Sequence, residues 1–244
     1  MSPITDFVFG SGTESYFSCS TLLHGKMLII GGSDRQRQIS ELVDCHGLAP
    51  VGTLSFDFYS GACGTYNFNH VDTVLLCFQQ SGGKHCHTIS SATEWEIVQI
   101  GFSNDAHKGT SLGSYNDRPV AIAGETSKKV ESFSNDRWEP LSEGSMMPIH
   151  DTLCGLRDFS TLTYGDRLWV FGGRYCEVDV HKDVRCYTVS TSSDVYWFGW
   201  RETGSYGWKL ESLSLNRARR GHRSILINHE VIHIGGADKT QFNM

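Results

Sequence analysis

The strongest constraint on the fold is a short apolar run that ends in a glycine pair and recurs along the chain. Residues 168–173 read Leu-Trp-Val-Phe-Gly-Gly, and residues 27–32 and 231–236 have the same pattern. Such a run is too short for a typical helix and is characteristic of a buried β-strand. The glycines permit a sharp turn with positive φ or the close approach of another backbone. The pattern therefore predicts a chain built from similar short strands.

Two weaker copies complete the series. Residues 119–124 lack one glycine and residues 74–78 lack both. Aligned on the first glycine or its substitute, the copies fall at positions 31, 77, 123, 172 and 235, at intervals of 46, 46, 49 and 63 residues. The first three intervals are close to the ~50-residue period of a four-stranded propeller blade.

The last interval contains about 15 residues more than that period, and we place the extra residues at 188–207. Residues 184–189 then become the third strand of the fourth repeat. The aromatic run at 195–200 becomes part of an insertion. That run either packs over the edge of the fold as an extended hairpin, or forms an exposed loop that binds a partner.

Composition supports an all-β fold and narrows the partners. The chain has 244 residues with 26 glycines and 5 prolines, and it lacks long stretches with helical periodicity. Its formal net charge of −6 argues against a nucleic-acid partner, because phosphate binding needs a basic surface. No apolar run approaches the roughly 20 residues of a membrane span. The N-terminus also lacks the pattern of a signal peptide.

The repeat resembles the kelch repeat over nearly the whole chain. Each unit has a first strand, a turn and an apolar strand, with Trp95 and Trp138 following 18 and 15 residues after the aligned position. Trp208 follows after 36 residues, and the first repeat has no tryptophan. The cysteine-containing repeats are similar to divergent kelch-like proteins of marine invertebrates. The resemblance implies a kelch-type β-propeller of five or six four-stranded blades, with the last blade incomplete at the C-terminus. The expected propeller is a single domain, 1–244, with repeats at roughly 16–59, 60–104, 105–156, 157–216 and 217–244.

Closure of this propeller needs additional strands in the last repeat, which stops soon after Gly236. Residues 1–15, which include Phe7, Val8 and Phe9, are candidates to lend a strand there. Without such closure the last repeat exposes an unpaired strand edge.

Eight cysteines raise the question of disulfide bonds and compartment. Cys77 and Cys86 are nine residues apart, and Cys176 and Cys186 are ten apart, so each pair is predicted to bridge a hairpin. The pairing of the remaining cysteines stays open; these are Cys19, Cys45, Cys63 and Cys154. Paired cysteines in a chain that is a fragment indicate an extracellular protein, and otherwise the chain is expected in the cytoplasm.

Motifs for chemistry are weak. In the segment His85-Cys86-His87, the cysteine faces away from both histidines on a strand, so we predict no metal there. No nucleophile or copper-site pattern is present, and we expect no cofactor and no enzymatic activity. The loops at one end of the strands instead gather arginines that suit an acidic peptide. The candidate partner-binding residues are Arg35, Arg37, Arg157, Arg174, Tyr175, Arg220 and His222.

The sequence therefore predicts a non-enzymatic module that binds a protein or peptide through these loops. Two alternatives stay open. One is a propeller enzyme that acts on a carbohydrate or small molecule, because this fold hosts several functions. The other is a truncated propeller without independent activity.

Overall fold

The computed structural model is all-β. It describes residues 19–32, 37–43, 47–59, 61–68, 70–79, 83–90, 97–142, 146–150, 153–179, 185–201 and 204–237, with the backbone alone at 178–179 and 185–189. The described residues form six antiparallel sheets and contain no helix. The predicted all-β class is therefore confirmed. The predicted contribution of Phe7, Val8 and Phe9 lies outside the described residues, as do Arg35, Cys45 and Trp95.

Four of the sheets have four strands each, in the order of the chain. Sheet 1 consists of β1 (Cys19–Leu23), β2 (Lys26–Ile30), β3 (Gln38–Val43) and β4 (Gly47–Thr53). Sheet 2 consists of β5 (Ala62–Phe68), β6 (Val71–Cys77), β7 (His85–Ile89) and β8 (Ile97–Phe102). Sheet 3 consists of β9 (Leu112–Tyr115), β10 (Arg118–Ile122), β11 (Val130–Ser134) and β12 (Arg137–Pro140). Sheet 4 consists of β14 (Ser160–Tyr164), β15 (Arg167–Phe171), β18 (Val195–Trp200) and β19 (Tyr206–Leu210).

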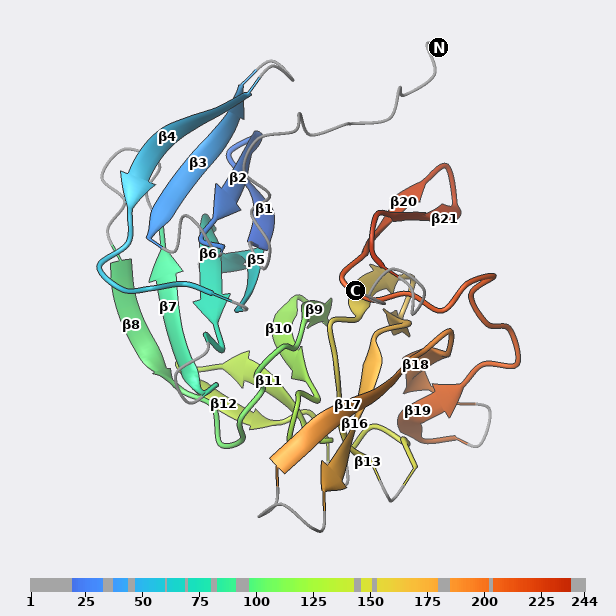
Figure 1. The fold of residues 1–244 in the computed structure, drawn as a ribbon. Coiled ribbons are helices and arrows are strands. Elements are labelled where there is room, and N and C mark those ends of the chain that lie inside the picture. Colours follow the sequence, from blue (N-terminus) through green and yellow to red (C-terminus); the bar gives the residue numbers. More distant parts are fainter. Residues whose placement is uncertain are drawn as a thin grey trace.

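Two smaller sheets complete the fold. The last hairpin pairs β20 (Arg223–Ile227) with β21 (Glu230–Ile234). A side sheet has the order β13 (Leu153–Arg157), β16 (Arg174–Asp179) and β17 (Arg185–Thr191). The first strands of consecutive sheets lie next to one another from β1 to β20. Figure 1 shows β1, β5 and β9 on the inner side and β4 and β8 on the outer side, which is a propeller-like arrangement.

Neighbouring sheets share apolar layers. One layer joins sheets 1 and 2 around Leu28 and Leu76, and a second joins sheets 2 and 3 around Leu75 and Trp138. A third joins sheets 3 and 4 and includes Trp208. Both tryptophans are over 90% buried, so they provide large apolar side chains between the sheets.

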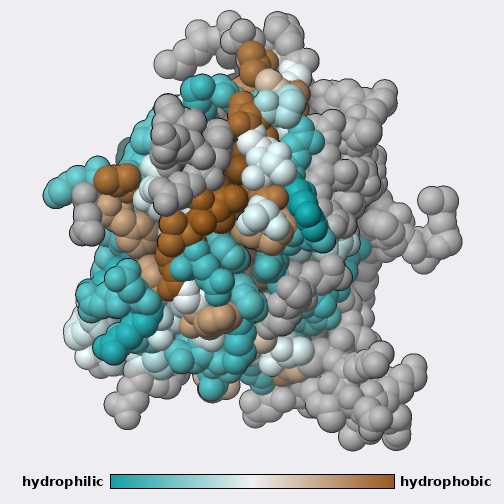
Figure 2. Space-filling model, turned by 90° about the vertical axis from the view of Figure 1, so that its left-hand side faces the viewer, coloured by the Kyte–Doolittle hydropathy of each residue, from teal (hydrophilic) through white to brown (hydrophobic). Residues whose placement is uncertain are grey.

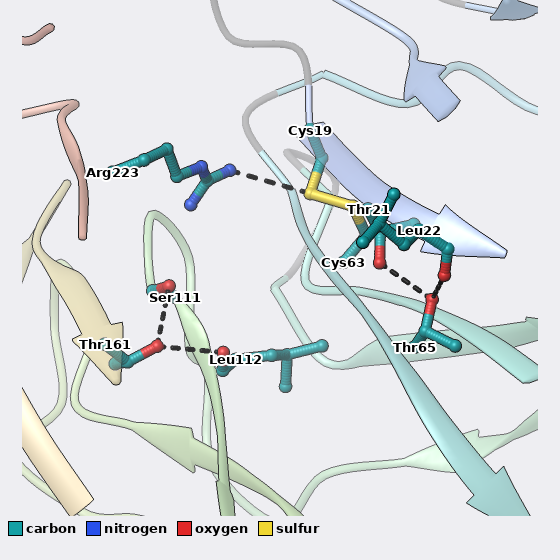
Figure 3. The surroundings of a disulfide bond; sticks show 9 residues. All are labelled: Cys19, Thr21, Leu22, Cys63, Thr65, Ser111, Leu112, Thr161 and Arg223. Atoms are coloured by element: carbon teal, nitrogen blue, oxygen red, sulfur yellow. Dashed lines mark hydrogen bonds between the residues drawn. A yellow bond between two sulfur atoms is a disulfide. The ribbon is translucent and has the colours of Figure 1, made fainter. Parts of the chain in front are cut away.

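Short polar side chains near the centre join the first strands of neighbouring sheets. Figure 3 shows Thr21 and Thr65 linked through their hydroxyls at 2.8 Å, and Thr161 donating to the carbonyl of Leu112 at 3.0 Å. The disulfide between Cys19 and Cys63 ties β1 to β5. These bonds fix sheet against sheet where the apolar layers end.

Three hairpin turns have residues that suit their backbone conformation. Asn116, Asn135 and Asn228 each begin a two-residue hairpin turn with positive φ at both central residues. This conformation matches the twist of the flanking strands and favours asparagine and glycine. The sequence at these three positions therefore suits the hairpins that form there.

The alignment of the repeats needs one correction. Positive φ after the second strand occurs at Gly31, Phe78, Ala123, Gly172 and Gly235. Cys77 is the last residue of β6 and pairs with Ala62, so Phe78 takes the place of the first glycine. The corrected intervals are 47, 45, 49 and 63 residues. The error arises because neither Cys77 nor Phe78 resembles a glycine.

The insertion in the fourth repeat also lies elsewhere. The aromatic run at 195–200 is β18, the third strand of sheet 4, and Val195 to Phe198 are buried. Residues 185–191 form β17 of the side sheet instead. The prediction of an insertion at 195–200 is therefore wrong, since these aromatic side chains fill the layers on either side of sheet 4.

The cysteines confirm one predicted bond and exclude another. Cys77 and Cys86 form a disulfide with their Cα atoms 4.1 Å apart, as directly opposed residues of β6 and β7. Cys176 is buried and free, so the predicted bond to Cys186 is wrong. The register explains this: Cys176 lies opposite Thr188, and Cys186 lies opposite Val178. Cys154 is disulfide-bonded as well.

Candidate functional site

Three of the predicted arginines meet where the side sheet, sheet 4 and the last hairpin come together. Arg157 and Arg174 are directly paired residues of β13 and β16. Both contact the carboxylate of Asp158, Arg174 through a short ion pair from Nε and Arg157 with its Nε 3.8 Å from Oδ2. Arg220 lies close enough for Arg157, Arg174 and Asp158 all to affect its pKa. The structure therefore groups guanidinium side chains from three separate segments around one carboxylate.

The backbone of Asp158 explains why these segments meet. Asp158 has a φ of 56°, and its N–H donates to the carbonyl of Gly109 at 2.8 Å. Its own carbonyl accepts from the N–H of Gly221 at 2.7 Å. One residue thus fixes the loop before β9 and the segment before β20, which carries Arg220.

A second carboxylate extends the group. Glu125 forms ion pairs with Arg157, whose Nη1 lies 3.1 Å from Oε1, and with Lys108, whose Nζ lies 2.8 Å from Oε2. We call Lys108, Glu125, Arg157, Asp158, Arg174 and Arg220 the arginine cluster. It has four positive and two negative side chains, so its formal charge is +4 − 2 = +2, in a chain whose net charge is −6.

The arginine cluster is partly shielded from water. The side chains of Arg157 and Arg174 are 20% and 13% exposed, whereas that of Lys108 is 38% exposed. Burial, followed by repulsion from Arg174 and Arg157, lowers the pKa of Arg220, and attraction to Asp158 only partly offsets this. An incoming anion would relieve that repulsion, and at a half-buried position the gain exceeds that of a surface ion pair.

Two further predicted residues turn inward. Tyr175 donates a short hydrogen bond to Asp194 and lies 2.7 Å from the hydroxyl of Tyr196. Burial, together with the bond to Asp194, raises the pKa of Tyr175. His222 is only 1% exposed and packs against His233, with ring centroids 5.5 Å apart. Neither polar group is presented to a partner, so both belong to the interior next to the arginine cluster.

Arg37 lies on sheet 1, separate from the arginine cluster. Its Nε is 2.6 Å from Asp57, and both side chains are more than half exposed. A pair in that setting contributes little to stability and is screened by salt.

A buried network beneath the loop of Lys108 was not foreseen. His107 is fully buried, with Nδ1 2.6 Å from the carbonyl of Ala123 and Nε2 2.8 Å from Glu131. Burial raises the pKa of Glu131, but hydrogen bonds from His107, the Asp105 backbone and Asn104 outweigh it and give a net lowering. The network holds the loop that carries Lys108. A histidine and a glutamate 24 residues apart give no motif by which this pairing could be recognised.

The segment 85–87 has a structural environment. Cys86 is in its disulfide, His85 lies against Phe102 with centroids 4.7 Å apart, and His87 stacks on Phe56 at 4.1 Å. Among the described residues, no group of three or more histidine, cysteine, aspartate or glutamate side chains is placed to hold a metal. No helix long and apolar enough to cross a membrane is found in the described part of the chain.

The outer side of sheets 1 and 2 has a different character. Figure 2 shows a band of apolar side chains crossing a largely hydrophilic surface there. Val98 and Phe102 of β8 are 45% and 56% exposed. β8 has neither charge nor proline, whereas β4 contains Pro50, β12 contains Arg137, Glu139 and Pro140, and β19 contains Lys209. Charges and prolines are the usual protection of strand edges, so β8 is the least protected outer strand.

Comparison with known proteins shows the fold and no more. No protein-family model and no curated protein matches the chain. Among solved structures, it is similar to that of YjhT, with a TM-score of 0.56 and 11% sequence identity over 96% of this chain and 94% of that one. At this identity the likeness concerns the arrangement of the backbone.

Proposed function

We propose that this chain is a kelch-type β-propeller of five or six blades that binds a protein or peptide partner. Support for the kelch assignment comes from the repeated turn with positive φ after each second strand. Buried Trp138 and Trp208 in the fourth strands of sheets 3 and 4 add to it.

The arginine cluster is the proposed binding surface, and its excess positive charge is the observation that carries the proposal. Carboxylates of an acidic peptide would take the position near Arg174 and Arg220, where charge-assisted hydrogen bonds are strong. Arg157 and Asp158 would hold those two arginines in place. Lys108, whose side chain is 38% exposed, would meet the peptide at its edge.

The test uses fluorescein-labelled hexaglutamate and measures its binding by anisotropy. The double variant Arg174→Gln/Arg220→Gln is expected to bind at least about tenfold more weakly, because each bond to a charged group is worth about 1.5–3 kcal/mol. Arg118→Gln is the matched control, since Arg118 is exposed and starts β10 at the opposite end from Ala123. Equal binding by the double variant and the wild type would exclude this surface.

A further inference from the structure

Arg174 is the residue of the arginine cluster whose donors are least used. Its side chain is only 13% exposed, and its Nε donates to Asp158. Its two terminal amino groups, Nη1 and Nη2, form no hydrogen bond with any described residue. They are also not among the buried polar atoms that lack a partner, so both remain accessible to water. A half-shielded guanidinium thus presents unused donors to an incoming group.

The position of this guanidinium is fixed from behind. Asp158 holds Nε, and the backbone of Asp158 is itself held by hydrogen bonds to Gly109 and Gly221 at 2.8 and 2.7 Å. The two terminal amino groups of an arginine form a planar fork that matches two oxygens of one phosphate or carboxylate. Because the fork of Arg174 is already oriented, an anion that binds there loses little affinity to ordering of the side chain.

The charge around the fork distinguishes between the two kinds of anion. The arginine cluster has a formal charge of +2, and a phosphate monoester carries about −1.5 to −2 at pH 7, whereas one carboxylate carries −1. The cations come from three segments: Lys108 precedes β9, Arg174 begins β16 and Arg220 precedes β20. A phosphoryl group has three terminal oxygens in different directions, so it can accept from several segments at once. The two oxygens of a carboxylate lie in one plane.

We propose that the arginine cluster recognises a phosphorylated side chain, such as phosphoserine, within the peptide that it binds. This inference rests on the proposed function, because the same arginines hold the peptide. Two phosphoryl oxygens take the fork of Arg174, and Lys108 and Arg220 surround the group from the other segments. Phosphorylation of the partner therefore switches binding on, since a serine hydroxyl has neither the charge nor the three acceptor oxygens.

The test measures the binding of three labelled peptides to the wild-type protein by fluorescence anisotropy at one ionic strength. The peptides share the sequence Gly-Ser-Gly-Xaa-Gly-Ser and carry phosphoserine, glutamate or serine at Xaa. The phosphoserine peptide is expected to bind at least about tenfold more tightly than the glutamate peptide, because one additional bond to a charged group changes affinity by about that factor. The serine peptide is expected to bind most weakly. Equal binding of the phosphoserine and glutamate peptides would overturn the proposal.

The variant Arg174→Lys separates the fork from the charge. It keeps a cation at this position but removes the paired donors, so the preference for phosphoserine over glutamate is expected to fall below about threefold. Arg118→Lys is the matched control, since Arg118 is exposed and lies at the far end of β10, and it is expected to keep the wild-type preference. An unchanged preference in Arg174→Lys would contradict the role of the fork.

Two further measurements identify the source of the anion and separate this inference from the proposed function. Inorganic phosphate is expected to displace the phosphoserine peptide only at concentrations at least about tenfold above those of the unlabelled peptide, because the peptide adds contacts of its own. Displacement at equal concentrations would show that free phosphate is the ligand. Hexaglutamate binding that depends on Arg174 and Arg220, without a preference for phosphoserine, would overturn this inference alone. Failure of both peptides to bind would overturn both proposals.

Discussion

The junctions between consecutive sheets and the exposed face of the last hairpin (Ile225, Ile232 and Ile234) are built from the same kinds of residue in opposite environments. Ile122 and Ile234 hold equivalent places before the turn, yet one is fully buried and the other is more than half exposed. The repeat places an apolar side chain there in every unit, whatever follows. The difference shows that a repeated apolar position demands a neighbour, and that an exposed copy marks where a neighbour is required.

The arginine cluster makes a second contrast with the last hairpin. It is polar, and its carboxylates and cations already contact one another within the described residues. A polar surface of this kind tolerates water and can exchange it for a ligand, whereas an exposed apolar face favours burial. We therefore propose the arginine cluster, and not the face of the last hairpin, as the surface that binds the acidic peptide.

The largest predicted effect on the free energy of unfolding comes from the disulfide between sheets 1 and 2. Cys19 and Cys63 are 44 residues apart, so the loop-entropy account gives their disulfide about 4 kcal/mol. Cys77 and Cys86 are 9 apart, which gives about 2.7 kcal/mol. Cys19→Ala/Cys63→Ala is expected to lower the free energy of unfolding in urea more than Cys77→Ala/Cys86→Ala does. The reverse order would show that the disulfide between sheets stabilises the fold less than the disulfide within sheet 2.

The next effect concerns the buried side chain at a closed junction. Ile122→Ala is expected to lower the free energy of unfolding by about 3 kcal/mol, because it removes buried apolar contacts and leaves a cavity. Leu213→Ala is the control, since Leu213 is 77% exposed, and its loss is expected to stay below about 0.5 kcal/mol. Similar losses for both would mean that the layer between sheets 3 and 4 is not tightly packed.

The boundary between the two regions is predicted to respond to pH through His222. Burial, followed by repulsion from His233, Arg219 and Arg223, lowers its pKa to about 3. The unfolded imidazole titrates near 6.5, so between these values the unfolded chain holds a proton that the folded chain excludes. The stability contributed by His222 is present above about pH 6.5 and is lost toward pH 3, at roughly 1.4 kcal/mol per unit.

The variant His222→Phe isolates this effect, since Phe159 holds the equivalent place before β14. Urea unfolding at several pH values should show a shallower loss of stability in the variant than in the wild type below about pH 6. Parallel curves would mean that His222 is protonated in the folded protein.

The smallest effect concerns the exposed side chain of the last hairpin. Ile234→Ala is expected to lower the free energy of unfolding by less than about 0.5 kcal/mol, because Ile234 is 54% exposed whereas Ile122 at the equivalent place is buried. Urea unfolding of both variants checks this. A loss as large as that of Ile122→Ala would mean that the side chain of Ile234 is buried in solution.

Local patterns predicted more of this fold than of the site. The apolar run before a glycine pair and the Asn-led turns identify strands, because the required conformations are local. Phe78 and Ala123 adopt positive φ although neither is a glycine. Because the second repeat has no glycine at this position, the sequence alignment placed Cys77 there instead of Phe78. The run at 195–200 misled in another way, since its aromatic residues are typical both of an exposed binding loop and of a strand buried on both faces.

Contacts between distant segments could not be predicted from the sequence. The Cys19–Cys63 bond needs sheets 1 and 2 to be packed before the two sulfurs meet, and no spacing rule indicates it. The loops that carry Arg157, Arg174 and Arg220 were predicted to share one end of the strands, and the structure groups them. The role of Asp158 as their common anchor depends on two backbone hydrogen bonds that no motif encodes.

Amide hydrogen exchange of the full chain, with and without saturating hexaglutamate, tests the division of roles most directly. Binding at the arginine cluster predicts slower exchange at residues 155–158, 172–175 and 219–222, with residues 230–234 unchanged. Slower exchange at the last hairpin, with the arginine cluster unaffected, would contradict the proposed binding at the arginine cluster.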